Sequence, residues 1–567
     1  MSVARQEKGF WRRHRWLKWV AGGLLVVLVA LGAAISIAVR RAEPFLRAQI
    51  VEKLSEHFHA RVELDYFHVS LVDGLRAEGK GLRIWPPDDA LRLPVQGEEG
   101  TDATKPLGPL IEIAEFRFHA PLEYKPGQPI RIHTVELKGL DIDVPPKSHF
   151  AHAAIAGGNE AGPAHKSSPL IQFEVENVQC TGAHLTLETS KPGKLPLEFA
   201  IARVKLTHVS ADGPMHFDAE LTNPKPAGTI VTSGSMGQWA VDDPGETPLA
   251  GEYQFKHADL AVFKGIAGIL ESTGKYQGVL RTLVVDGQTD TPDFRLTDFG
   301  TSIPLRTKFH AIVDGTNGDT RLEPVDATLA RSHFTAEGQV VRVPAETLKN
   351  GTERPAGGEI SLKVNVDRGR IEDFLKLTSQ TGTPLLTGDL TAKSLMDISP
   401  GQEPVHERLK LNGSFHLEDA EFTSEKIQDD VGQLSMRGQG RPKDAKINGG
   451  KDVRSAIESD FKMAGGVISL PDVKYTVPGA EIDVGGTYGV DKGTLDFVGT
   501  ARMQATVSQL VGGWKGILLK PADRFFKKDG AGTEIPIHVR GTRKDPDFGV
   551  DFNRLKHSSP ATPGMPQ

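Results

Sequence analysis

Hydrophobic and polar residues alternate over most of this chain. In residues 480–499, Ile482 and Val484 alternate with acidic residues, and Leu495 and Phe497 alternate with polar residues after a glycine-rich turn. This spacing places every second side chain on the same face of a β-strand. The segment therefore predicts a hairpin with one apolar and one polar face.

The same alternation recurs on both sides of this hairpin and predicts a mainly β protein. About 30 to 35 such strands, spaced by about 4.8 Å, would form a sheet at most about 160 Å long. Little in the sequence is typical of a helical layer that could cover so many apolar faces. Apolar positions in the alternating segments include Phe309, Val313, Ile360, Leu362, Val364, Ile468, Leu470, Ile482, Val484, Leu495 and Phe497.

An uncharged apolar run precedes the strands. Residues 19–39 would form a helix about 30 Å long, which is enough to cross a bilayer. The basic residues of segment 1–18 favour an N-terminus in the cytoplasm and the rest of the chain outside it. A cleaved signal peptide is the alternative. The anchor residues of the predicted span are Trp19, Leu24, Leu25, Val26, Val27, Leu28, Val29, Leu31, Ile35, Ile37 and Val39.

Four segments have the apolar spacing of amphipathic helices. Residues 42–58 predict a helix that either caps the end of the sheet or lies in the lipid headgroup layer. Segments 257–280 and 367–390 each predict a short helix followed by a strand that begins Gly-x-Leu. Segment 505–526 predicts a cap or a contact at the far end of the molecule. Its candidate contact residues, with the lysines that follow, are Trp514, Phe525, Phe526, Lys527 and Lys528.

These features divide the chain into regions. A cytoplasmic tail (1–18) and a membrane span (19–39) precede the first strands (40–144). Residues 145–169 are small, polar and rich in proline and glycine, which is typical of a loop or linker. A repeated β region (170–400), a C-terminal β region (401–555) and a disordered tail (556–567) follow.

The sequence contains no motif that indicates catalysis. Residues 268–276 have the wrong glycine spacing for a phosphate-binding loop, and the single cysteine, Cys180, has no base beside it. The histidine pairs lack a third metal ligand nearby. The net charge of −6 does not favour nucleic acid as a partner. We therefore expect a protein that is not an enzyme and has no cofactor and no metal.

Several segments carry a resemblance. They are residues 60–85 after the span and helix, residues 274–296 with their Gly-x-Leu strand, residues 422–442, and residues 532–551 with a Pro-Ile strand. Together they resemble the AsmA-like family of bacterial envelope proteins, which are anchored in the inner membrane and similar to the chorein-type bridge proteins. The resemblance covers nearly the whole chain, although its middle part is unspecific alternation.

The resemblance implies an elongated, twisted antiparallel β-sheet that forms a gutter with an apolar inside. Phospholipid acyl chains would lie in it, and the protein would carry them through the periplasm between the envelope membranes and support outer-membrane homeostasis. A protein of the periplasm or outer membrane at the C-terminal end would be a further partner. The alternatives are a scaffold or assembly factor for outer-membrane proteins with a filled β core, and an extracytoplasmic enzyme or glycan binder. The apolar positions given above for the alternating strands, from Phe309 to Phe497, are the candidate groove residues.

Overall fold

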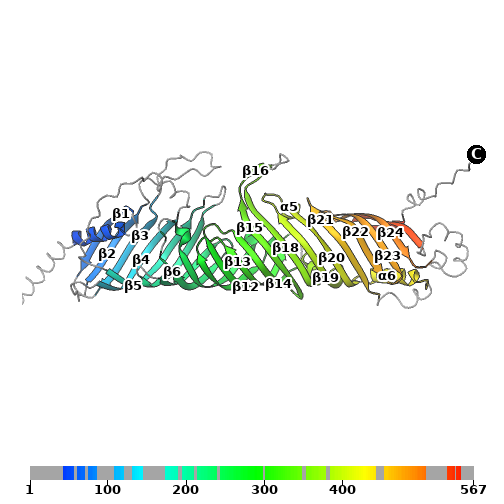
Figure 1. Cartoon of the computed structure of the whole chain (residues 1–567), viewed down its shortest axis with the longest axis horizontal. Helices are drawn as coiled ribbons and strands as arrows, with labels where there is room; N and C mark the ends of the chain where they lie inside the picture. The colour runs from blue at the N-terminus through cyan, green and yellow to red at the C-terminus, as the bar shows by residue number, and fades with distance from the viewer. Residues whose placement is uncertain are drawn as a thin grey trace, which may run out of the picture.

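The computed structural model shows a mainly β protein built around one 24-stranded sheet (Figure 1). The structure describes residues 43–56, 60–70, 75–85, 108–120, 130–144, 173–189, 195–209, 214–238, 240, 243–297, 301–347, 353–378, 384–441, 453–505, 533–542 and 545–550.

The strands of the N-terminal half lie within residues 62–313. They are β1 (Val62–Ser70), β2 (Leu75–Ile84), β3 (Ile111–Ala120), β4 (Ile130–Val144), β5 (Phe173–Leu187), β6 (Leu197–Val209), β7 (Met215–Pro224), β8 (Ala227–Met236), β9 (Pro248–Asp259), β10 (Ile266–Ala267), β11 (Ile269–Val279), β12 (Thr282–Leu296) and β13 (Ile303–Val313). The short 3-10 helices η1 (Pro244–Glu246) and η2 (Leu260–Val262) lie in two of the connections.

The C-terminal half continues the sheet with β14 (Thr320–Leu329), β15 (Ser332–Val343), β18 (Gly357–Arg370), β19 (Leu386–Ile398), β20 (Leu409–Phe422), β21 (Ser455–Ala464), β22 (Val467–Val477), β23 (Ala480–Gly489), β24 (Thr494–Met503), β25 (Thr533–Thr542) and β26 (Asp545–Val550). The short strands β16 (Glu346–Thr347) and β17 (Glu353–Arg354) pair only with each other, outside the large sheet. The helices α4 (Ile371–Leu377), α5 (Val405–Arg408) and α6 (Glu425–Gly438) lie between strands.

The sheet is long, open and strongly twisted, and its strands succeed one another from one end of the molecule to the other (Figure 1). Strands that are neighbours in the sequence are almost always neighbours in the sheet, as in the pairs β12–β13 and β22–β23. The strands are fewer and longer than predicted, because patterns at 130–132 and 140–144 belong to one 15-residue strand, β4. At about 4.8 Å per strand the sheet is about 110 Å long, which is shorter than the predicted upper limit.

The prediction of a purely antiparallel sheet was wrong at one place. β4 and β5 are parallel, so Ile130 lies beside Phe173 and Val144 lies beside Leu187. A parallel pair needs a long connection, because the chain must return to the edge from which the first strand started. The predicted linker, residues 145–169, lies outside the described residues.

The N-terminal helix is confirmed for residues 43–56. Its apolar residues Leu46, Ile50 and Leu54 pack against a cluster of buried residues from β1, β2 and β3. Glu43 accepts a hydrogen bond from the backbone N–H of Val69 at 3.1 Å, and the Arg47 guanidinium donates to the Leu64 carbonyl oxygen. The contacts bear out the prediction of a helix that caps the sheet.

The two predicted helical insertions have different outcomes. The helix in 367–390 is confirmed as α4, which is followed by β19. The helix in 257–280 is wrong, because β9 continues to Asp259 and only the three-residue η2 precedes β10 and β11. Gly265 and Gly268 there have φ angles of +93° and +139°, which a helix does not tolerate.

No helix among the described residues is long and apolar enough to cross a membrane. The predicted span 19–39 with its anchor residues from Trp19 to Val39 lies outside the described residues. The same holds for almost all of segment 505–526, for its contact residues Trp514, Phe525, Phe526, Lys527 and Lys528, and for the tail 556–567.

Buried carboxylates attach α4 to the edge of the sheet. Asp373 is fully buried, and its carboxylate accepts hydrogen bonds from the backbone N–H of Arg331 at 3.1 Å and from the hydroxyl of Ser332 at 2.9 Å. Burial alone would raise the pKa of the neighbouring Glu372. Hydrogen bonds from backbone N–H groups and the Arg370 guanidinium outweigh burial and hold that pKa below its usual value. These bonds fix α4 so that Ile371 and Phe374 pack on the sheet.

We expect Asp373→Ala to lower the free energy of unfolding by about 3 kcal/mol, because it leaves buried donors without an acceptor. Denaturant unfolding followed by circular dichroism measures the change. Asp367→Ala is the control: its carboxylate is about half exposed and pairs with His333, so we expect a loss below about 1 kcal/mol. Equal losses in the two variants would contradict the role given to Asp373.

Candidate functional site

One face of the sheet carries an unbroken row of apolar or small residues. Residues that are cross-strand partners lie on the same face, so the row can be followed from β1 to β25 through the register of each pair. Tyr276 and Tyr488 are its only members with a hydroxyl group. The row consists of Val69, Ala77, Phe118, Val135, Val178, Leu206, Phe217, Gly234, Gly251, Tyr276, Val285, Ala311, Leu322, Gly338, Leu362, Met396, Leu411, Met463, Ile468, Tyr488, Leu495 and Gly541.

The opposite face carries the charges. The row displaced by one residue contains only polar side chains from β1 to β13, and acidic and basic residues are interspersed along it. Cross-strand polar contacts such as the His310–Asp286 hydrogen bond at 2.8 Å and the Lys363–Glu337 ion pair at 2.8 Å lie on this face. The row consists of His68, Glu78, Arg117, Glu136, Gln179, Lys205, Asp218, Ser233, Glu252, Lys275, Asp286 and His310.

All the candidate groove residues lie on the apolar face. Leu362, Ile468 and Leu495 belong to the row itself, and the others are two, four or, for Ile482, six residues away from it on their own strands. None of them is fully buried and none is fully exposed. The sheet therefore brings these residues together on one surface, and the chain's own side chains do not cover that surface completely.

The apolar face is the more enclosed of the two faces. Burial raises the pKa of the phenols of Tyr253, Tyr276 and Tyr475, which lie on this face. On the polar face, by contrast, the pKa of Lys363 and Lys474 is raised chiefly by hydrogen bonds to neighbouring carboxylates. Burial has this effect on phenols because it disfavours the charged phenolate, so these three phenols lie in surroundings with little water.

The ends of the strands form the two long edges of the sheet, and these two edges come into contact at one place. Lys264, in the turn before β11, donates to the Gln402 side-chain oxygen at 2.8 Å, and Gly265 lies against the side chain of Val405 in α5. The turn before β11 and the turn before β20 belong to opposite edges, as the register of the intervening strands shows. Only a strongly curved sheet allows this contact. β-Bulges, such as those near Thr291 and Val366, supply bends in the strands.

Aromatic rings lie flat on glycines of neighbouring strands on the apolar face. A Cβ atom on Gly274 would come within 2.8 Å of the Tyr253 ring, and one on Gly251 would come within 2.8 Å of the Tyr276 hydroxyl. A Cβ atom on Gly287 would come within 2.7 Å of the Phe309 ring. Because these glycines have no side chains, the rings can lie directly on the backbone, and few side chains project from this part of the face.

A group of hydroxyls interrupts the apolar face and was missed in the sequence. Tyr253 and Ser272 are 3.0 Å apart at their oxygen atoms, Thr289 and Thr307 are 2.7 Å apart, and Thr232 and Tyr276 are 2.8 Å apart. Serine and threonine are ordinary residues of a polar strand face, so only the register of β11, β12 and β13 reveals that these hydroxyls lie on the apolar side.

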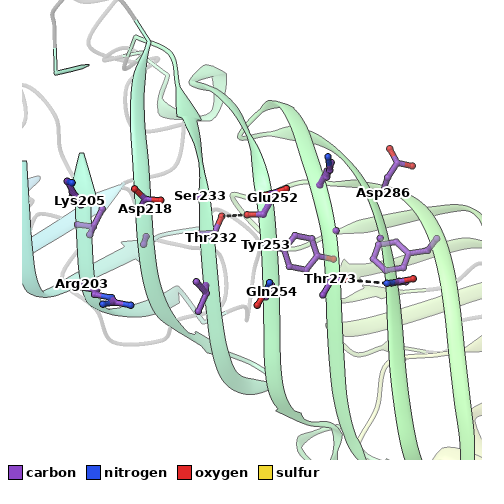
Figure 2. A pocket seen from close by; sticks show the side chains of 18 of the residues that line it. Arg203, Lys205, Asp218, Thr232, Ser233, Glu252, Tyr253, Gln254, Thr273 and Asp286 are labelled. Atoms are coloured by element: carbon purple, nitrogen blue, oxygen red, sulfur yellow. Dashed lines mark hydrogen bonds between the residues drawn. The ribbon is translucent and has the colours of Figure 1, made fainter. Parts of the chain in front are cut away.

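Three cavities lie on the polar face. The largest, of about 1400 Å³, crosses the strands from β5 to β14, and Lys205, Asp218, Glu252 and Asp286 are among its lining residues (Figure 2). The others, of about 830 and 670 Å³, lie between β14 and β22. Among the candidate groove residues only Phe309 and Val364 border them. A sheet that is both twisted and bent is curved in two directions. Its apolar face is concave in the direction of the strands, and its polar face is concave in the direction perpendicular to them.

The described residues offer little chemistry beyond these two faces. Burial raises the pKa of the Cys180 thiol, which makes it a poor nucleophile. His406, Glu407 and Asp491 are close enough to hold a metal ion, but both carboxylates are exposed and His406 already pairs with Asp491 at 2.7 Å. That pair joins α5 to the turn before β24 and is sufficient to explain the cluster.

Comparisons with known proteins add no identification. A scan against protein-family models, a search of curated proteins and a search of solved structures each found no match to this chain. The resemblance to the AsmA-like family stays a prediction. The apolar face with its partly exposed residues is therefore the feature from which a function has to be argued.

We expect the phenols of Tyr253, Tyr276 and Tyr475 to ionise only above their ordinary pKa of about 10. Because the folded pKa exceeds the unfolded pKa, their contribution to stability is present below about pH 10 and is lost as the pH rises through the folded pKa. Ultraviolet titration of the wild type and of Tyr253→Phe measures this. Tyr66→Phe, which removes an exposed tyrosine, is the control. The idea fails if Tyr253→Phe removes no late-titrating phenol.

Gly274→Ala should destabilise the sheet by about 1–3 kcal/mol, because overpacking a close contact forces strands apart. The added Cβ would come within 2.5 Å of the Asp286 backbone oxygen and 2.8 Å of the Tyr253 ring. Thermal unfolding measures the loss. Gly358→Ala is the matched control, since no atom lies within 4 Å of the added carbon and we expect little change. Similar effects at both positions would refute this packing.

Proposed function

We propose that the protein holds phospholipid acyl chains on the apolar face of its sheet and lets them move along that face between two membranes. The single observation that supports this most strongly is the apolar row from Val69 to Gly541, which crosses the sheet without one charged side chain. A row that is continuous over so many strands is a path, whereas a binding pocket would be confined to a few of them.

The energy of lipid transfer explains why such a path is useful. Moving a chain of about 16 carbons into water costs roughly 13 kcal/mol, at about 0.8 kcal/mol for each methylene. Contact with apolar side chains along the whole route removes most of that cost at every position. The charged headgroup stays in solvent. No step in this process needs a nucleophile, a general base or a metal.

The proposed location is the bacterial inner membrane, with residues 19–39 as a single anchor and the sheet in the periplasm. The uncharged run and the basic tail before it support this arrangement. An extent of about 110 Å gives the protein a limited reach. We propose that a protein of the periplasm or outer membrane continues the path from the C-terminal end.

A scaffold or assembly factor with a filled β core is the second candidate. Such a core would bury the residues of the apolar face as deeply as those of an ordinary sandwich. Leu362, Ile482 and Phe497 are only partly buried, so the described residues give less support to this reading. The cavities of the polar face are the feature that favours it, since a protein partner could bind there.

Leu362→Asp and Leu395→Asp form a matched pair that tests the proposal. The two leucines lie on neighbouring strands, but Leu362 faces the apolar side, whereas Leu395 is 51% exposed on the polar side. The full-length protein is purified, and its bound phospholipid is measured by extraction and mass spectrometry. Transfer of a fluorescent phospholipid between two vesicle populations is measured in parallel.

We expect Leu362→Asp to reduce bound lipid and transfer about tenfold or more, because a carboxylate would have to be desolvated against acyl chains. The variant should remain folded, since water reaches the residue when lipid is absent. Leu395→Asp should behave like the wild type. If wild-type protein of native fold carries no phospholipid, the proposal is rejected. If Leu362→Asp unfolds instead, the filled core is favoured.

A further inference from the structure

The hydroxyl cluster on the apolar face consists of Tyr253, Ser272, Thr289 and Thr307. Ser272, Thr289 and Thr307 are cross-strand partners in one row over β11, β12 and β13. The hydroxyl of Tyr253 reaches this row from the neighbouring strand β9, because its ring lies on Gly274 of β11 and its oxygen lies over Gly287 of β12. The cluster is thus a small polar island in the middle third of the sheet.

The hydrogen bonds within the cluster leave donors unused. Each hydroxyl has one proton to donate. Tyr253 and Ser272 share one hydrogen bond, and Thr289 and Thr307 share another, so each pair keeps one O–H group for which the described residues provide no acceptor. The adjacent Thr232 differs, because it donates to the Glu252 carbonyl oxygen at 2.9 Å and accepts from Tyr276 at 2.8 Å.

The surroundings limit what could accept these hydrogen bonds. No charged side chain lies on the apolar face in the paired segments of β9, β11, β12 and β13 around the cluster. A phosphate or another anion would therefore lose its hydration without a cation to compensate it. A hydrocarbon would leave the two O–H groups unpaired. An uncharged oxygen that only accepts hydrogen bonds satisfies both conditions.

We infer that the hydroxyl cluster binds the ester carbonyl groups of diacyl lipids. A diacyl lipid has two such carbonyls at the junction of its chains and its headgroup, and each can accept one of the unused O–H groups. The inference rests on the proposed function, since it needs acyl chains on the apolar face. It adds a position at which a passing lipid is held by its glycerol ester region, and it gives the path a chemical selectivity.

The probe is a competition between two phospholipids that have the same headgroup and the same chain lengths. One carries its chains through ester bonds and the other through ether bonds, which lack the carbonyl oxygens. The full-length protein is incubated with vesicles containing both in equal amounts, recovered, and analysed for bound lipid by mass spectrometry. We expect the ester lipid to be bound about fivefold more than the ether lipid, from two weak hydrogen bonds.

Variants locate the selectivity. Tyr253→Phe, Ser272→Ala, Thr289→Val and Thr307→Val in one variant remove both hydroxyls of each pair, so the cluster keeps no O–H group that could donate to a carbonyl oxygen. Valine is well accepted in strands, so the fold should persist. We expect the ester-to-ether ratio to fall towards one while the total bound lipid stays near the wild-type amount. Thr273→Val combined with Thr328→Val changes hydroxyls on the polar face of β11 and β14 and should keep the wild-type ratio.

The outcomes separate this inference from the proposed function. If both lipids bind equally to the wild type, the ester-binding role is wrong while the lipid path stands. If the variant without the four cluster hydroxyls keeps the preference, the selectivity lies elsewhere and the inference also fails. If neither lipid binds to the folded wild type, the proposed function falls together with it.

Discussion

The register between neighbouring strands is the constraint on which the rest of this structure depends. A shift by one residue at any pair would bring the charged row onto the apolar face from that strand onward. The bulges preserve the phase instead of breaking it: Leu322 and Val325 flank one bulge, and Leu470 and Val473 flank another, and all four side chains stay on the apolar side. Curvature is thereby introduced without mixing the two faces.

Much of this arrangement could be predicted from alternation alone. Leu362 and Leu495 could be assigned to an apolar face because alternation is a local property. The helix expected in 257–280 was wrong because the apolar residues there fit the spacing of a helix as well as that of a strand. The positive φ angles of Gly265 and Gly268 are not compatible with a helix. The hydroxyl cluster could not be foreseen, since a threonine such as Thr289 takes its meaning from which strand lies beside it. Nor could the cavities of the polar face be foreseen, because their lining residues come from many different strands.

The two faces serve the protein in different ways. Interspersed charges on the polar face keep a sheet of this length soluble and discourage association between copies. The apolar face contributes less to stability than a packed core would, because compact clusters of buried residues occur where residues 43–56, α4 and α6 cover it. Stability is thus concentrated at a few covered sites, and the stretches between them are only partly covered by the protein's own side chains.

The ends of the strands form two long sides of the sheet, here called rims. Because β4 and β5 are parallel, every later strand runs in the opposite direction to the one it would have in a purely antiparallel sheet, and every later turn lies at the other rim. In a purely antiparallel sheet, α4 and α6 would lie at the rim opposite the start of β1. With the parallel pair, α4, α6 and the start of β1 all lie at the same rim. Of the two rims, only this one carries α4 and α6 and the residues that follow the N-terminal helix. One parallel pair of strands has thus made the two sides of the sheet unequal among the described residues: α4, α6 and the N-terminal helix share one side, and α5 lies on the other.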